Sequence, residues 1–179
     1  SDARAQLGLP EDLFIIGTVA RLEYSKNLEL LIQTADKLRN HHLLFVILGD
    51  GPDRDHLSKI IERQQLTNHI MILNCFPDPK ILIKAFNNFI ITSRYEGLPY
   101  TLLEAGLSQT PIISPDVGGI SEVIDQTYKA DPDCLARQIL ALKKTPNSQT
   151  QITYQKIIAN FSLAKMLAQT IQVYVETMA

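Results

Sequence analysis

The stretch SRYEGLPYTLLEAGLSQTPIISPDVGGISE, residues 93–122, decides the expected fold of this chain. It follows the apolar run Phe89-Ile90-Ile91, which is typical of a buried parallel strand. Gly97 allows a turn, and Pro99 suits the first position of a helix, because its missing N–H costs nothing there. The residues that this helix would turn toward a core are Leu102, Leu103 and Leu107. The stretch therefore predicts a strand, a loop and a helix.

Two carboxylates mark this strand–loop–helix unit. Glu96 lies in the loop and Glu104 lies one to two turns into the helix. The amides near Leu98, Tyr100 and Thr101 would be unpaired donors at a helix N-terminus, where anions bind well. Taken singly, Glu96 could cap the helix that follows it, and Glu104 could be a solvated helix residue. As a pair they favour vicinal hydroxyls, and the whole unit suits a nucleotide sugar.

Strands and helices alternate along most of the chain. Apolar runs predict strands at 14–20, 43–48, 70–73, 89–92 and 111–114. Helices are expected at 27–38, from 52, at 81–86, from 99 and after the Val117-Gly118-Gly119 turn, and the chain from 131 onward is expected to be helical. This pattern predicts an α/β, Rossmann-like doubly wound parallel sheet of five or six strands, with helices on both faces and C-terminal helices after it. We expect residues 1–179 to form one domain.

Ligands bind such sheets at the carboxyl ends of the strands. The segments 20–26, 49–51, 93–98 and 114–119 would all lie along that edge. The first of them carries Arg21 and Lys26, and a planar guanidinium with a mobile ammonium suits a diphosphate. Any loop can hold an arginine and a lysine, but the position of these two at the ligand edge favours a binding role.

Composition excludes several classes of protein. The net charge of −2 gives no reason to expect nucleic-acid binding, and no apolar run reaches the ~20 residues of a membrane span. Cys75 and Cys134 lie far apart, which fits a reducing cytosol. The histidines show no metal spacing. The Asp-x-Asp pairs at 53–55 and 131–133 stand at expected helix starts, where aspartate favours the dipole, so we interpret both as structural.

Several motifs together resemble one family. They are the whole run from Ser93 to Ala105, then Pro111-Ile112-Ile113, Val117-Gly118-Gly119 with Glu122, Gly17-Thr18-Val19-Ala20-Arg21-Leu22 with Lys26-Asn27, and Gly49-Asp50-Gly51-Pro52. With them the chain resembles the C-terminal, donor-binding domain of the group 1 glycosyltransferases, which are retaining enzymes of the two-Rossmann-domain (GT-B) fold. The resemblance runs from Leu7 to about Leu142 and is weaker after that residue.

The resemblance implies roles for individual residues. The catalytic set would be Arg21, Lys26 and Glu96, with both cations on the donor diphosphate and the glutamate on hydroxyls of the hexose. Glu104 would bind the ribose hydroxyls. The remaining donor-binding positions would be Phe76 against the nucleobase, and Gly97, Leu98, Tyr100 and Thr101 around the phosphates. No cofactor or metal is implied, and the sugar would be transferred by same-face attack on an oxocarbenium-like donor.

The resemblance also implies partners. An N-terminal domain, absent from this chain, would hold a carbohydrate or lipid-linked acceptor, and the donor would be a UDP- or GDP-hexose used in polysaccharide biosynthesis. We expect no transmembrane segment and a cytoplasmic location, with peripheral attachment to the inner face of the membrane as an option. By itself the chain is expected to bind a nucleoside diphosphate or its sugar weakly and to transfer nothing.

The chain departs from the family pattern at a few positions. Ala20, Asn27 and Asn74 replace the usual glycines. After Glu122 the usual Gly-rich turn and short strand are missing, so a sixth strand would be absent or reduced to about Tyr128-Lys129. That edge of the sheet would then be exposed or covered by the last helices.

Three other interpretations stay open on the sequence. A catalytically silent nucleotide-sugar binding or regulatory module would keep the same fold and residues. A flavodoxin-like phosphoacceptor domain needs an acidic cluster after the first strand, whereas Ala20-Arg21-Leu22 is basic. A non-hydrolysing sugar-nucleotide epimerase has a similar fold and would convert a donor without any acceptor.

Overall fold

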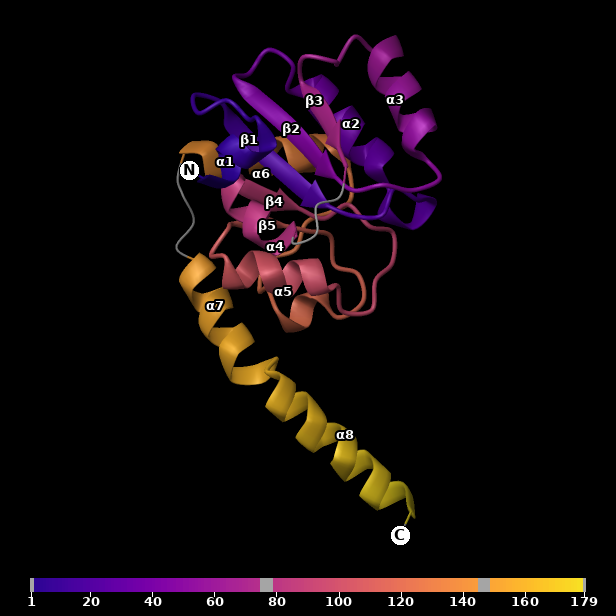
Figure 1. The fold of residues 1–179 in the computed structure, drawn as a ribbon, viewed down its shortest axis with the longest axis vertical. Helices are drawn as coiled ribbons and strands as arrows, with labels where there is room; N and C mark the ends of the chain where they lie inside the picture. The colour runs from indigo at the N-terminus through magenta and orange to yellow at the C-terminus, as the bar shows by residue number, and fades with distance from the viewer. Residues whose placement is uncertain (1, 75–78, 145–148, 179) are drawn as a thin grey trace.

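A five-stranded parallel sheet forms the centre of the protein (Figure 1). The computed structural model describes residues 2–74, 79–144 and 149–178. The strands are β1 (Phe14–Val19), β2 (Leu43–Leu48), β3 (Ile70–Leu73), β4 (Asn88–Ile90) and β5 (Ile112–Ile113). Their order across the sheet is β3-β2-β1-β4-β5. The predicted parallel α/β fold is confirmed, with the lower of the two expected strand numbers.

Helices cover both faces of this sheet, as predicted. The helices on one face are α1 (Asp2–Leu7), α4 (Pro79–Leu82), α5 (Tyr100–Leu107) and α7 (Gln149–Asn160), together with the 3-10 turns η2 (Ile83–Ala85) and η3 (Ile120–Glu122). Those on the other face are α2 (Leu28–Lys37), α3 (Arg54–Arg63) and α6 (Pro132–Lys144). Two elements remain, the 3-10 turn η1 (Tyr24–Lys26) and the last helix α8 (Leu163–Met178).

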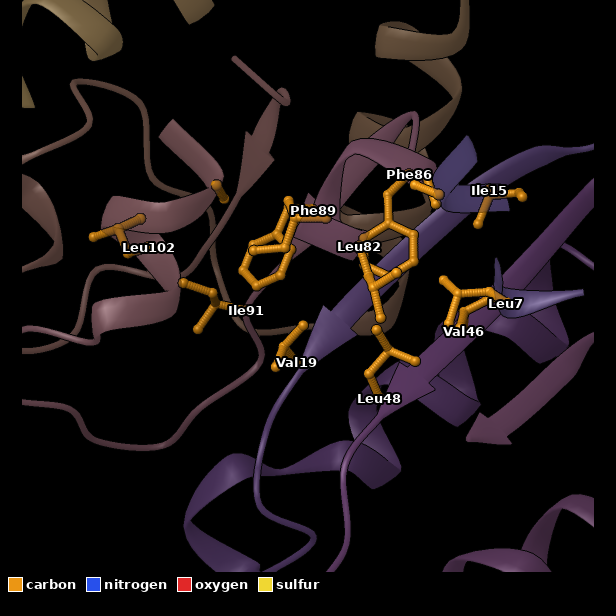
Figure 2. Packing of buried hydrophobic residues seen from close by; sticks show 14 of the residues in the cluster. Leu7, Ile15, Val19, Val46, Leu48, Leu82, Phe86, Phe89, Ile91 and Leu102 are labelled. Atoms are coloured by element: carbon orange, nitrogen blue, oxygen red, sulfur yellow. The ribbon is translucent and has the colours of Figure 1, made fainter. Parts of the chain in front are cut away.

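Successive residues of a strand pack alternately into two hydrophobic cores, one on each face of the sheet. Ile15 and Phe89 pack into the cluster under α1, α4 and α5, which Figure 2 shows. The residues that follow them, Ile16 and Ile90, pack into the cluster under α2, α3 and α6. Side chains alternate between the faces of a strand, so a strand covered on both sides must be apolar throughout. This is why the strands read as unbroken apolar runs.

Two elements of the structure differ from the sequence predictions, whereas the sheet edge beyond β5 agrees with one of the expected outcomes. The N-terminal helix α1 was not expected from the sequence. The turn at Val117-Gly118-Gly119 leads only into η3, a single 3-10 turn, and not into a full helix. Tyr128 donates its backbone N–H to the carbonyl of Ser114 at 2.9 Å, beside the end of β5. Because this is one hydrogen bond and not a ladder, no sixth strand forms within the described part of the chain.

The last helix, α8, extends away from the sheet (Figure 1). None of its described residues is buried, and apolar side chains such as Ile171 and Val175 are about three-fifths exposed, at 61% and 62%. Within the described residues, no helix combines the length and the apolar character that crossing a bilayer requires.

A buried arginine attaches α1 to the amino ends of β1 and β4. The Arg4 side chain is 9% exposed. Its guanidinium donates to the carbonyl of Ala85 at 3.1 Å and to Oδ1 of Asn87 at 2.8 Å. It also donates to the carbonyls of Pro10, Glu11 and Leu13. These acceptors lie in separate segments, so one side chain fixes the connection that leads into β1.

Replacing this arginine should weaken the fold. Arg4→Ala leaves carbonyls at a buried site without a donor, and we expect a loss of about 2–4 kcal/mol in the free energy of unfolding, measured by urea denaturation. Arg63→Ala, at an exposed position in the last turn of α3, is the matched control and should change it by less than about 0.5 kcal/mol. Equal effects of the two substitutions would contradict the role given to Arg4.

Candidate functional site

The site lies where the order of the strands reverses. β1 and β4 are neighbours in the middle of the sheet, with β2 and β3 on one side of them and β5 on the other. The chain therefore leaves β1 and β4 in opposite directions, and the two loops separate at the carboxyl edge. Such switch points are where open α/β sheets bind ligands. The loop after β1 carries Arg21 and Lys26, and the loop after β4 carries Ser93 and Glu96.

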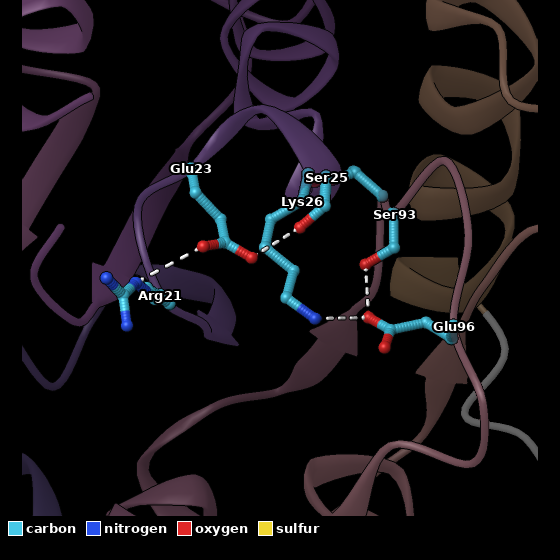
Figure 3. A network of polar contacts seen from close by, with 7 residues as sticks. Arg21, Glu23, Ser25, Lys26, Ser93 and Glu96 are labelled. Carbon is cyan, nitrogen blue, oxygen red and sulfur yellow. Dashed lines mark hydrogen bonds and ion pairs between the residues drawn. The ribbon is translucent and has the colours of Figure 1, made fainter. Parts of the chain in front are cut away.

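An ion pair joins these two loops. The ammonium of Lys26 lies 2.7 Å from Oε1 of Glu96, and the two side chains are 24% and 11% exposed. The hydroxyl of Ser93 donates to the same Oε1 at 2.6 Å (Figure 3). Charge-assisted hydrogen bonds that are largely shielded from water are stronger than those of an exposed pair. The structure thus places together the lysine and the glutamate that were predicted to act on one ligand.

Backbone contacts fix the same two loops. The Thr92 hydroxyl donates to the carbonyl of Lys26 at 2.7 Å, and the Arg94 N–H donates to the carbonyl of Ser25 at 2.9 Å. The Arg94 guanidinium lies over the ring of Tyr24, 4.5 Å from its centroid. The position of Lys26 relative to β4 is therefore set by its main chain as well as by its charge.

Arg21 occupies the other end of this network (Figure 3). Its Nε lies 3.2 Å from Oε2 of Glu23, and the arginine side chain is 70% exposed. The Ser25 hydroxyl donates to Oε1 of Glu23 at 2.6 Å, which fixes the carboxylate that holds the arginine. An exposed arginine in a weak surface pair is accessible to an anion.

The start of α5 forms the next part of the edge. Pro99 has extended backbone, with ψ 127°, so it precedes the helix and is not its first residue as predicted. It provides no side-chain cap, which leaves the first amides of α5 available, including those of Tyr100 and Thr101. Leu98 and Gly97 lie in the loop just before them, and Glu104 lies one turn after Thr101.

Glycines bring the remaining two segments against these loops. A Cβ on Gly118, whose φ is +57°, would lie 1.9 Å from the carbonyl oxygen of Glu96. The Gly119 N–H donates to the carbonyl of Gly97 at 2.6 Å. A Cβ on Gly49 would likewise lie 1.9 Å from the carbonyl oxygen of Ala20. The four segments expected at the carboxyl edge therefore form a connected row, in which 49–51 contacts 20–26, 20–26 contacts 93–98, and 93–98 contacts 114–119.

The space enclosed by these loops is small. A cavity of about 20 Å³ lies at the strand ends, and its polar lining comes from Thr18, Lys26, Ser93, Glu96 and Thr101. That volume holds about one water molecule. A larger ligand would extend out of this cavity, with these side chains beneath it.

The remaining sequence predictions concern the nucleobase contact and the Asp-x-Asp pairs. Phe76, predicted at the nucleobase, lies outside the described residues. Both carboxylates of the Asp-x-Asp pair at 131–133 make contacts within the protein. The Cys134 N–H donates to Asp131 at 2.9 Å at the start of α6, and this bond lowers the pKa of that carboxyl. Asp133 pairs with Lys37 at 2.8 Å. No group of three or more histidine, cysteine or acidic side chains in the described ranges is arranged to hold a metal ion.

The backbone explains one departure from the family pattern. Asn27 has φ 51° and ψ 43°, a left-handed conformation that asparagine tolerates better than most residues and that glycine adopts freely. Among the described non-glycine residues, positive φ values occur at Asn27, Gln65 and Gln109. Ala20 is not one of them, so alanine fits there without strain.

Three side chains of this network, Ser25 among them, were not singled out from the sequence. Ser93 holds Glu96, and Glu23 holds Arg21. The serine had a weak signal, a small hydroxyl residue three positions before the glutamate in the loop. Glu23 had none, because its contact depends on how the η1 turn folds back.

The family model and the related sequences point to the same family. The family model described as "Glycosyl transferases group 1" matches residues 1–158. The O-antigen biosynthesis glycosyltransferase WclY of Escherichia coli is 25% identical over 175 residues, which cover 96% of this chain and 49% of WclY. The chain thus spans about half the length of that relative.

Solved structures show the same fold. A glycosyltransferase from Rickettsia africae superposes with a TM-score of 0.87 at 19% identity, covering 99% of this chain and 51% of that one. HepE of Anabaena, solved in complex with UDP, superposes with a TM-score of 0.85 at 21% identity, covering 98% of this chain and 52% of that one.

The contact between Gly118 and Glu96 gives a test of how the edge is built. Gly118→Ala should lower the free energy of unfolding by about 1–3 kcal/mol, because the methyl group overlaps the Glu96 carbonyl and the positive φ disfavours alanine. Gly97→Ala is the matched control, since a Cβ there meets nothing within 4 Å. Urea denaturation of both variants makes the comparison, and an undisturbed Gly118→Ala protein would contradict the close contact.

Proposed function

Since the chain belongs to the glycosyl transferases group 1 family, we propose that it is the donor-binding half of a retaining glycosyltransferase. The enzyme would move a hexose from a UDP- or GDP-sugar to an acceptor hydroxyl. The observation that carries the proposal is the Lys26–Glu96 pair, 2.7 Å apart at the switch point of the sheet. One cation and one carboxylate at that place suit a ligand with a phosphate at one end and hydroxyls at the other.

The diphosphate would lie between Lys26, Arg21 and the start of α5. The arginine is 70% exposed and so can turn from Glu23 to a phosphate without a large desolvation cost. The uncapped amides of Tyr100 and Thr101 add donors and the positive end of the helix dipole. The net charge of the chain is −2, so attraction for a diphosphate has to come from this local arrangement.

The sugars would lie against the two glutamates. Glu96 accepts the bonds of Lys26 and Ser93 on Oε1, and within the described residues no hydrogen bond reaches its Oε2. That oxygen is available to a hexose hydroxyl. Glu104 lies on α5 after the phosphate-binding turn, where it would take the ribose hydroxyls. Phe76 would contact the base.

The chemical step needs stabilisation of the leaving diphosphate. Same-face attack by the acceptor on an oxocarbenium-like donor leaves charge on that group, and Arg21 and Lys26 would stabilise it in place. A preorganised donor or cation of this kind contributes roughly 10²–10³ in rate. No side chain of this half is assigned as a base for the acceptor.

A second domain would complete the cleft. The chain spans about half of WclY and of the superposed structures, and its loops enclose a cavity of only about 20 Å³. The other side of the donor and the carbohydrate or lipid-linked acceptor would then be held by an N-terminal acceptor domain. That domain could also cover the exposed apolar side chains of α8.

Isothermal titration calorimetry with UDP and GDP tests donor binding. HepE was solved with UDP and with UDP-glucose, which makes UDP the first probe. We expect binding of at least one of the two nucleotides, and about tenfold weaker binding by Arg21→Ala because a charge-assisted bond is lost. Arg63→Ala, an exposed arginine outside the site, should bind like the wild type. Absence of binding by a folded wild-type chain would contradict the proposal.

Transfer should require the other domain. We expect the chain by itself to release no UDP from UDP-glucose in the presence of sugar acceptors, because half of the cleft is missing. A coupled assay for released UDP, run beside the calorimetry, measures this. Turnover by the chain alone would show that this half carries the acceptor site as well.

A further inference from the structure

We propose that Ser93 is a positioning residue, which fixes the Glu96 carboxylate for the donor sugar after Lys26 has moved to the diphosphate. This inference rests on the proposed function and deepens it. Ser93, which was not among the predicted site residues, would hold the sugar-binding carboxylate of Glu96 in place. Recognition of the sugar would then not depend on Lys26, which binds the phosphate.

The starting point is that two donors share one oxygen. Lys26 at 2.7 Å and Ser93 at 2.6 Å both reach Oε1 of Glu96. Figure 3 shows the lysine and the serine approaching the carboxylate from different loops. With both donors on one oxygen, the orientation of the carboxylate is defined, and Oε2 is left for a further hydrogen bond.

A bound donor would compete for the lysine and not for the serine. An ammonium on a flexible stem can turn toward a phosphate, which offers it more negative charge than one carboxylate. The hydroxyl of Ser93 is a single neutral donor on a short side chain. Its backbone directly follows Thr92, whose hydroxyl is bonded to the Lys26 carbonyl at 2.7 Å. The serine therefore stays with Glu96 when the lysine leaves.

Burial makes the serine bond hard to replace. Ser93 is 3% exposed and the Glu96 side chain 11% exposed. Only the single water molecule that the cavity of about 20 Å³ can hold is within reach to replace the hydroxyl, and a carboxylate that loses both protein donors would be free to turn. The backbone of this turn is meanwhile fixed, because Gly118 packs against the Glu96 carbonyl and the Gly119 N–H donates to the Gly97 carbonyl, so rotation of the Glu96 side chain is the freedom that Ser93 removes.

The test compares affinities for UDP and for UDP-glucose by calorimetry. Ser93→Ala should weaken UDP-glucose binding about tenfold and leave UDP binding within about twofold, because one hydrogen bond to a charged group is lost on the sugar side alone. Thr34→Ala, which removes a buried hydroxyl in the middle of α2, is the matched control and should change neither affinity. Equal loss for both ligands, or no loss for UDP-glucose, would overturn the inference.

A double-mutant cycle separates positioning from a direct contact. In the Glu96→Ala background, adding Ser93→Ala should have no further effect on UDP-glucose binding, because the serine acts through the glutamate. An additive loss would mean that Ser93 touches the donor itself and would refute the positioning role. Failure of the proposed function looks different, since the wild-type chain would then bind neither nucleotide.

Discussion

The parallel pairing of β1 with β4 is the constraint on which the rest of the site depends. Gly17 in β1 faces Phe89 in β4, and a Cβ on that glycine would lie 2.1 Å from the ring of Phe86. The missing side chain lets the segment before β4 pack closely on β1. With these two strands adjacent, residues from positions 26 and 96 of the chain come within hydrogen-bonding distance. Any other strand in the place of β4 would separate the lysine from the glutamate.

The charged side chains of the site form two ion pairs. Lys26 neutralises Glu96 and Arg21 neutralises Glu23, and the two pairs differ in burial. The exposed arginine pair costs little to break, whereas the shielded lysine pair is stronger. A diphosphate would replace two carboxylates as the partner of these cations. In that exchange the carboxylates need other partners, and serines already hold both of them, Ser25 on Glu23 and Ser93 on Glu96.

Local patterns predicted most elements well. The strand at 43–48 is found with the predicted bounds, and the one at 70–73 as well, because buried parallel strands are apolar on both faces. The N-terminal helix α1 escaped prediction, since it is short and depends on the buried hydrogen bonds of Arg4. The expected helix after Gly119 is only a 3-10 turn, whose glycines are fixed against the Glu96 loop. Neither α1 nor the short η3 turn can be predicted from the spacing of apolar residues along the chain.

By itself the sequence determined the α/β class, the apolar strands, and the four segments that would end at one edge of the sheet, because these follow from side-chain type and spacing along the chain. Only the tertiary structure decided the strand order, the absence of a sixth strand in the described residues, and the sharing of Glu96 between Lys26 and Ser93. These depend on contacts between residues about 70 positions apart, such as that of Lys26 with Glu96. Such contacts are set by packing of whole elements, which no local pattern encodes.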